Sequence, residues 1–276
     1  NNVFPMGSEH TKLSFSSYQF LERFMEATRA NLFFAKGVII VEGDAENLLI
    51  PTIAEIIGKP LHRYGVSIVN VGSTAFKRYA DIFKRKDGSD FGVPVSIISD
   101  LDVRALEYYK AKDEDFPSGI ADASDLEKAR AAKKKEIEDA NNEGEIHIYL
   151  PNQWTLEYEI ACSKLQKYLF CAVYVAKRED NKKFRYEKAL LEADKKWAEL
   201  YGGETIEDDK QRAYDIFSEL DDGKASKAAT AQYLADMLSK QYQKEIGDNS
   251  ENTIKYILEH DPYLQYIIDA IKHVTK

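Results

Sequence analysis

Short apolar runs alternate with helical patterns over the first half of the sequence. The run Val38-Ile39-Ile40-Val41 lies between Gly37 and Glu42-Gly43, and β-branched runs bounded by glycine are typical of buried strands in parallel sheets. Three further runs predict strands at residues 66–71, 93–98 and 146–150. Because helical patterns separate these strands, we expect an α/β fold with a parallel four-stranded sheet and right-handed crossovers.

Helical patterns fill the remainder of the chain. A helix is predicted over residues 12–36, and Ser73 or Thr74 is expected to cap the helix that follows the second strand. The Ala-Lys-Glu block at residues 125–140 predicts a solvated helix, and the sequence after Trp154 shows helical patterns only. We therefore expect an additional all-helical subdomain after the sheet.

Composition narrows the class of protein. The chain has 276 residues, of which 44% are hydrophobic, enough for two compact units. The sequence contains no apolar run of 18 residues, so we expect no membrane partner. Cys162 and Cys171 are too few for a disulfide scaffold or a thiolate zinc site, and no secretory signal is visible. Together these features predict a cytoplasmic protein.

The balance of charge limits the kind of nucleic-acid binding to expect. Lys and Arg number 38 against 47 Asp and Glu, which gives a net charge of −9. Proteins that coat nucleic acid are usually basic, so that class is disfavoured. An enzyme acting on nucleic acid stays open, because divalent cations held by clustered carboxylates offset the negative charge.

Carboxylates lie at the ends of two predicted strands. Glu42 follows the first strand, and Asp100 and Asp102 follow the third. The carboxyl ends of parallel strands meet at one edge of the sheet, and residues i and i+2 of an extended chain point to the same side. We therefore expect Asp100 and Asp102 to face one ion with Glu42. An all-oxygen ligand set favours Mg²⁺ or Mn²⁺ over zinc, although each motif alone is also common in strand ends and loops.

Several motifs resemble those of a known family. Val41-Glu42-Gly43 with Ser99-Asp100-Leu101-Asp102 is similar to the Toprim domain of topoisomerases, primases and nucleases. Residues 31–46, 154–159 and 227–232 resemble segments of the OLD (overcoming lysogenization defect) nucleases, and the resemblance covers roughly residues 18–240. It implies a Toprim-type sheet flanked by helices and metal-dependent cleavage of DNA.

The resemblance also implies roles for individual residues. The implied catalytic residues are Glu42, Asp100, Asp102 and Lys227, and the implied metal ligands are Glu42, Glu46, Asp100, Asp102 and Glu157. With two Mg²⁺ or Mn²⁺ ions, Glu42 and the aspartate pair would hold one ion, and Glu46 with Glu157 would help hold the second. Shared ligands could reverse this partition. Lys227 would stabilise the charge that develops on the phosphate.

Other polar residues keep alternative interpretations. Asp44 is favoured as a cap of the following helix over a role in the site, and Ser99 either binds a ligand or ends its strand. Two basic segments could contact DNA phosphates or could be solvated faces. They are Lys77-Arg78 with Lys84–Lys86 on the second helix, and Lys182–Tyr186, which is favoured as a helix with lysines extending to solvent.

The family implies a longer polypeptide with an ABC-type ATPase domain upstream. This sequence has no Gly-x-x-x-x-Gly-Lys-Ser/Thr phosphate loop, so we expect the C-terminal nuclease part. Its predicted segments are a helical connector from the ATPase (1–36), a Toprim catalytic core (37–160), a helical subdomain (161–222) and C-terminal helices (223–276), the first of which returns Lys227 to the site. The ATPase is expected to dimerise. No residue here decides whether this part forms a homodimer or has a helicase partner in phage defence.

Two other classes compete with a DNA endonuclease or nickase. A topoisomerase- or primase-like Toprim protein needs a breakage-reunion domain or a zinc-binding polymerase context, and the helical remainder resembles neither. A non-catalytic module for DNA docking or assembly would be favoured by loss of a ligand carboxylate, whereas all of the expected acids are present.

Overall fold

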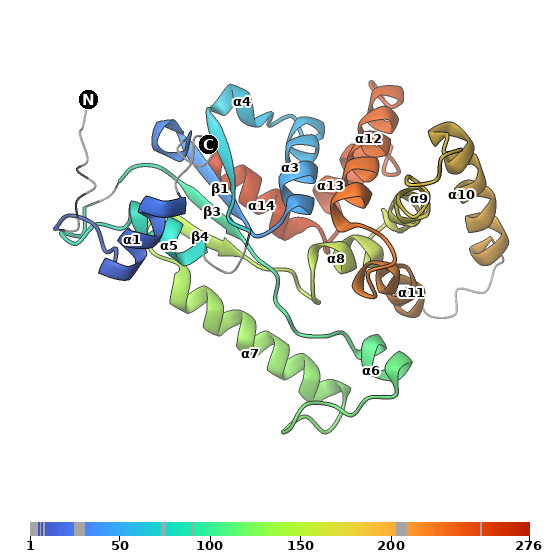
Figure 1. Ribbon diagram of the computed structural model, residues 1–276, viewed down its shortest axis with the longest axis horizontal. Coiled ribbons are helices and arrows are strands. Elements are labelled where there is room, and N and C mark those ends of the chain that lie inside the picture. Colours follow the sequence, from blue (N-terminus) through green and yellow to red (C-terminus); the bar gives the residue numbers. More distant parts are fainter. Residues whose placement is uncertain are drawn as a thin grey trace.

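A parallel sheet of four strands forms the centre of the molecule. The computed structural model describes residues 5, 7, 9–24, 31–72, 76–89, 91–202, 209–248 and 250–276. The strands are β1 (Gly37–Val41), β2 (Val66–Asn70), β3 (Val95–Ile98) and β4 (Ile146–Tyr149), in the order β2-β1-β3-β4 (Figure 1). All three pairings are parallel, which confirms the predicted α/β fold class.

The register of the sheet aligns the carboxyl ends of the strands. β1 and β3 are central and buried along their whole length, which explains their continuous apolar sequences. Val41, the last residue of β1, lies opposite Asn70 of β2 and Ile98 of β3, and Ile98 lies opposite Tyr149 of β4. The residues that follow β1 and β3 therefore emerge side by side at one edge.

Helices cover both faces of this sheet. The elements of the first half are α1 (Phe15–Phe24), η1 (Asn31–Phe34), α3 (Asp44–Ile56), α4 (Leu61–Tyr64), α5 (Phe76–Ala80), η2 (Asp81–Phe83), α6 (Leu106–Lys112) and α7 (Ala123–Asn141). Ile39 and Val41 point into a core cluster with α3, whereas Val38 and Ile40 point into a second cluster with α1 and α5. This alternation along β1 is the ordinary period of a strand.

The helical half of the chain shares the larger core cluster with the sheet. Its elements are α8 (Leu156–Cys162), α9 (Gln166–Ala176), α10 (Tyr186–Tyr201), α11 (Asp209–Asp221), α12 (Lys227–Lys244), α13 (Ile254–His260) and α14 (Gln265–Val274). α12 packs against α3 and α9, and α14 returns to lie against β3, β4 and β1 (Figure 1). Ser96 of β3 donates its hydroxyl to the carbonyl of Ala270, at 2.8 Å. One hydrophobic core thus continues across residues 160 and 222. The domain boundaries predicted at these two positions stay predictions.

The amino-terminal helix is shorter than predicted. Residues 12–14 are not helical, α1 spans Phe15–Phe24, and a 3-10 turn follows at Asn31–Phe34. Thr11 forms an antiparallel bridge with Arg85, so this part of the chain is held against the core. Residues 25–30 of the expected helix lie outside the described residues, as do Ser73 and Thr74, the candidate caps of the helix after the second strand. Within the described ranges, no helix has the length and apolarity needed to cross a membrane.

Candidate active site

Glu42 and Ser99 meet directly at the carboxyl edge of the sheet. Each follows a central strand, and the hydroxyl of Ser99 donates a hydrogen bond to Oε1 of Glu42. Burial raises the pKa of Glu42, the Ser99 hydrogen bond opposes that rise, and the negative charge of Asp102 adds to it. The sequence left two interpretations of Ser99, which were ligand binding and the end of a strand. The structure adds a third role, because the hydroxyl of Ser99 orients the Glu42 carboxylate.

Glu46 reaches the same edge from the first turn of α3. Its side chain folds back over Gly43, so that a Cβ at Gly43 would lie 2.9 Å from Glu46 Oε2. Burial, with the charge of Glu157 as the next cause, raises the pKa of Glu46 from 4.5 to about 7. The predicted cap at Asp44 is wrong, because Gly43 occupies the N-cap position. Asp44 is exposed and accepts a hydrogen bond from Asn70 Nδ2 at 2.7 Å.

Asp100 and Asp102 face different neighbours. Oδ1 of Asp100 accepts a hydrogen bond from the backbone N–H of Leu156 at 3.1 Å. Burial raises the pKa of Asp100 well above its ordinary value, and the charges of Glu157 and Glu46 raise it further. Asp102 is exposed, has φ of 54°, and acts on Glu42 instead. The prediction that Asp100 and Asp102 point to the same side of an extended chain is therefore wrong. The chain leaves the extended conformation after β3, as the positive φ of Asp102 shows.

Lys227 and Glu157 come from two helix starts. Thr155 caps α8 by accepting a hydrogen bond from Tyr158 N–H, and Ser226 caps α12 in the same way through Ala229 N–H. Nζ of Lys227 lies 3.2 Å from Oε2 of Glu157, whose side chain is 8% exposed, while that of Lys227 is 46% exposed.

The charge of Lys227 is held by the acids around it. Burial lowers the pKa of Lys227, but Glu157 and then Asp100 outweigh that effect and raise it above its ordinary value. The ammonium therefore partly offsets a cluster that consists of Asp100, Glu46 and Glu157.

Three cationic side chains of α7 contact backbone carbonyls in the loops at this edge. The sequence analysis did not predict this role. Lys133 Nζ lies 3.5 Å from the carbonyl oxygen of Asp102, and Lys134 Nζ lies 3.0 Å from that of Leu150. Arg130 is 3% exposed and donates to the carbonyl of Arg104 at 3.4 Å. One side of the predicted solvated helix thus stabilises the chain after β3 and β4. The spacing of these cations on one helix face was a signal for this role.

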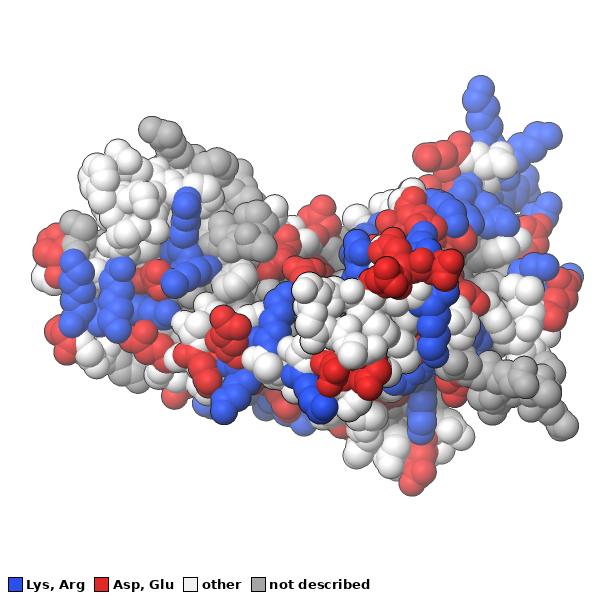
Figure 2. Space-filling view, turned by 90° about the horizontal axis from the view of Figure 1, so that it is seen from below, with Lys and Arg blue, Asp and Glu red and all other residues white. Residues whose placement is uncertain are grey.

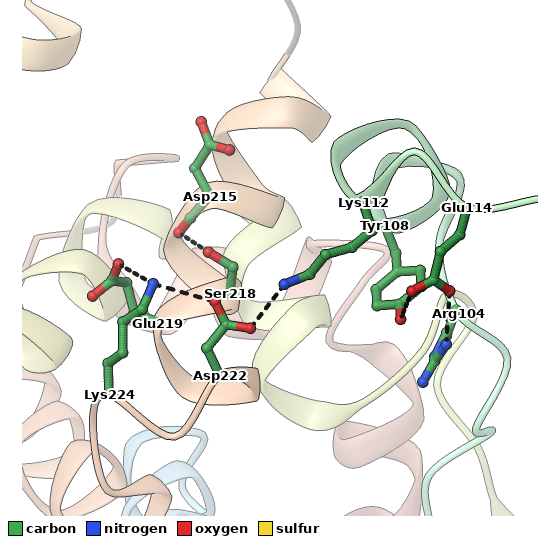
Figure 3. A network of polar contacts seen from close by, with 9 residues as sticks. All are labelled: Arg104, Tyr108, Lys112, Glu114, Asp215, Ser218, Glu219, Asp222 and Lys224. Carbon is green, nitrogen blue, oxygen red and sulfur yellow. Dashed lines mark hydrogen bonds and ion pairs between the residues drawn. The ribbon is translucent and has the colours of Figure 1, made fainter.

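A second polar network ties α6 to the end of α11 and the loop after it (Figure 3). Lys112 of α6 reaches Oδ1 of Asp222 at 3.0 Å, and Lys224 lies 3.2 Å from the other oxygen of Asp222. Lys224 also contacts Glu219 of α11 at 3.4 Å. The network thus joins α6 to the end of α11 and to the loop that precedes α12.

Two members of the first basic segment, Lys84 and Arg85, lie away from this edge. Lys84 is 8% exposed and pairs with Asp81 at 3.2 Å and with Glu143 at 3.8 Å. Glu143 precedes β4, so these residues lie near the amino ends of the strands. Arg85 is buried as well and donates to the carbonyl of Pro5 at 2.7 Å. For Lys84 and Arg85, both the solvated face and phosphate contact beside the acids are therefore wrong.

Most of the other residues in the two basic segments are exposed. Lys77 and Lys86 are exposed, and Arg78 is half-buried over the ring of Phe20. Lys182–Arg185 form a loop before α10 rather than the favoured helix. On the face of the molecule in Figure 2, Lys and Arg side chains are interspersed with Asp and Glu.

The acids fit a hard divalent cation by their chemistry. They are all oxygen donors. Burial, and after it the charges of neighbouring acids, raises the pKa of both Glu46 and Asp100, and a bound cation would offset the crowding of negative charge. Their spacing is not that of a closed site: within the described part of the chain, no three His, Cys, Asp or Glu residues are grouped to hold a metal ion.

Comparisons with known proteins agree with the motif at this edge. Residues 33–102 match the family model described as "Overcoming lysogenization defect protein-like, TOPRIM domain", which confirms the resemblance over that segment. The motifs at 154–159 and 227–232 lie outside the match and stay predictions. A comparison with curated proteins found no match.

Two similar solved structures are C-terminal regions of OLD proteins. That of Xanthomonas campestris pv. campestris is 20% identical, with 89% of this chain and 94% of that chain covered and a TM-score of 0.43. That of Burkholderia pseudomallei is 18% identical, with 88% of this chain and 100% of that chain covered and a TM-score of 0.43.

Proposed function

We propose that this chain, whose residues 33–102 form an OLD-like Toprim domain, is a nuclease that hydrolyses DNA phosphodiester bonds with the help of divalent cations. The observation that carries the proposal is the convergence of Glu42, Asp100 and Glu157 with an ammonium group at one edge of a parallel sheet. Such an edge is where ligands gather in open α/β folds. The proposed reaction is endonucleolytic cutting or nicking.

The proposed ligands are Glu42, Glu46, Asp100, Asp102 and Glu157, holding two Mg²⁺ or Mn²⁺ ions. Bound ions would lower the pKa of an attacking water and offset charge on the phosphate. The electrostatic couplings support a partition in which Asp102 acts with Glu42, whereas Asp100 acts with Glu46 and Glu157. Ser99 would keep the Glu42 carboxylate in place through its hydrogen bond.

Lys227 is proposed to stabilise the phosphate. Its ammonium is accessible to solvent and already lies beside the acids, at 3.2 Å from Glu157 Oε2. Charge-assisted hydrogen bonds from an ammonium suit the negative charge that develops on a phosphate oxygen during cleavage. The surrounding acids keep Lys227 protonated, which this role requires.

DNA is the proposed partner, with α7 beside the site as a contact surface. Lys133 places an ammonium at the loop that carries Asp102, and Arg104 lies on the same loop with its guanidinium over the Tyr108 ring. Lys133 is next to the acidic edge through its contact with the carbonyl of Asp102, unlike Lys84 and Arg85. Cations at this position would contact the phosphates that flank the one being cut.

The proposal extends to the partners that the family implies. These are an ABC-type ATPase domain upstream on the same polypeptide, a dimer formed through it, and a helicase in phage defence. The residues encoded before Asn1 test the first of these, because a phosphate loop among them supports the ATPase and its absence opposes it.

Cleavage of supercoiled plasmid DNA tests the activity. We expect nicked or linear product with Mg²⁺ or Mn²⁺ and none with a chelator. Asp100→Asn and Glu42→Gln should abolish cleavage. Asp44→Asn is the matched control, because Asp44 belongs to the same segment but is exposed and bonded to Asn70. Full activity of Asp100→Asn or Glu42→Gln, or cutting in chelator, would contradict the proposal.

A further inference from the structure

Tyr266 lies beneath the carboxyl edge of the sheet, on the first turn of α14. Ser96 of β3 bonds the carbonyl of Ala270, and His273 Nε2 lies 2.9 Å from the carbonyl of Glu145, which precedes β4. α14 therefore runs antiparallel to the strands. One helical turn back from Ala270 is Tyr266, and the same distance forward from Ser96 reaches the end of β3. Tyr266 is thus level with the residues that precede Asp100.

The hydroxyl of Tyr266 is buried and has no hydrogen-bond partner among the described residues. The side chain is 8% exposed. Burial raises the pKa of Tyr266 well above its ordinary value, and the charges of Glu159, Asp100, Glu46 and Glu157 raise it further. The hydroxyl therefore stays protonated and is a donor. The carboxylates that act on it are three members of the candidate site and one neighbour on α8.

A buried donor without a partner destabilises the fold, and phenylalanine would fill the same space without that penalty. The orphaned hydroxyl therefore points to a role that packing does not explain. We infer that Tyr266 is a positioning residue of the acidic site, whose hydroxyl donates a hydrogen bond to the Asp100–Glu46–Glu157 carboxylates when a divalent cation is bound. Hydrogen bonds of this kind orient ligand carboxylates and strengthen metal binding.

This inference rests on the proposed function, because it assumes that the acids hold a cation. Calorimetric titration with Mn²⁺ alone, without DNA, measures binding to the unmodified chain and to Tyr266→Phe. We expect Tyr266→Phe to bind Mn²⁺ about 10-fold or more weakly. The melting temperature of metal-free Tyr266→Phe should be unchanged or higher, because the variant removes an unpartnered polar group.

Tyr214→Phe is the matched control. Tyr214 is 3% exposed and its hydroxyl is likewise buried without a partner, but its nearby charges are Lys112, Asp221 and Asp222. Tyr214→Phe should bind Mn²⁺ as the unmodified chain does. Equal Mn²⁺ affinity of Tyr266→Phe and the unmodified chain would overturn the inference alone. An equal loss in Tyr214→Phe would also overturn it, and no Mn²⁺ binding by the unmodified chain would overturn the proposed function as well.

Discussion

Lys227 Nζ and Glu157 Oε2 lie 3.2 Å apart although 70 residues separate them in the sequence. Each stands in the first turn of its helix, α12 or α8. α8 and α12 both pack against α9, and α12 also packs against α3, whose own first turn carries Glu46. The packing of these helices therefore assembles the part of the site that the sheet does not supply.

Replacing Lys227 separates catalysis from metal binding. Lys227→Met removes an ammonium that we assign to the phosphate, so cleavage should fall by about 10²–10³-fold. Mn²⁺ binding should not weaken, because Lys227 pairs with Glu157 and its positive charge opposes a cation. Single-turnover cleavage and calorimetry measure the two effects. Lys224→Met, which removes an exposed lysine of the preceding loop, should leave both unchanged, and weaker Mn²⁺ binding by Lys227→Met would contradict the assignment.

Gly43 is expected to matter for the position of Glu46 rather than for folding. A Cβ there would meet Glu46 Oε2 at 2.9 Å, and the end of a flexible side chain can move away. Gly43→Ala should therefore weaken Mn²⁺ binding while it costs less than about 1 kcal/mol of stability as an N-cap change. Calorimetry and chemical denaturation check the two parts. Unchanged Mn²⁺ affinity would argue against Glu46 as a ligand.

Gly37, at the other end of β1, should show the opposite behaviour. A Cβ there would lie 2.8 Å from the carbonyl oxygen of Val274 and 3.1 Å from its Cβ, and backbone cannot yield cheaply. Gly37→Ala should lower the free energy of unfolding by about 1–3 kcal/mol through displacement of α14. Mn²⁺ affinity should change less than in Gly43→Ala. Full stability of Gly37→Ala in urea denaturation would mean that α14 does not pack on β1 as described.

The sheet and its acidic edge were predictable from sequence for one physical reason. Strands buried on both faces need continuous apolar residues, as in β1 and β3, so their ends can be read directly. Parallel strands then bring Glu42 beside Ser99 and Asp100 without further information. The direction of the Asp102 side chain was harder to predict from sequence. Its φ of 54° depends on the conformation of the loop after β3 and not on a strand pattern.

Long-range packing set the limits of prediction. The pattern of α14 indicates an amphipathic helix but not that it returns to β3. Lys84 and Arg85 read as a basic face, yet ion pairing and burial near the amino ends of the strands remove them from the site. Lys133 and Lys134 read as solvated, yet they bond carbonyls near the acids. Charge in the sequence does not reveal which partner a side chain will find.

Lys133 provides a test of the DNA surface. Lys133→Glu should weaken binding to a short duplex and reduce the salt slope of the binding constant by about 1, as expected for one lost phosphate contact. Fluorescence anisotropy at two salt concentrations in chelator measures this without cleavage. Lys135→Glu makes the same charge change at an exposed position of α7 and should have the smaller effect. If the two variants weakened DNA binding equally, the change in net charge alone would explain the loss, and Lys133 would not be a specific phosphate contact.

The stability of the metal-free chain should depend on pH through Glu46. Its pKa is about 7 in the folded state against 4.5 ordinarily, so folding favours the protonated carboxyl. This contribution is fully present below pH 4.5 and is lost as pH rises through about 7, by at most about 3 kcal/mol. Glu159, whose pKa burial also raises to about 7, adds a second contribution of the same sign.

Chemical denaturation of the unmodified chain and Glu46→Gln at several pH values isolates the contribution of Glu46. The stability of Glu46→Gln relative to the unmodified chain should increase between pH 5 and pH 8, because glutamine cannot acquire the buried charge. Glu55→Gln, an exposed change on the same helix, should leave the pH dependence unaltered. With saturating Mn²⁺ the pH trend of the unmodified chain should reverse, since a cation binds the deprotonated carboxylate and stabilises the folded state. A constant difference between Glu46→Gln and the unmodified chain across this range would show that Glu46 is not perturbed by its buried neighbours.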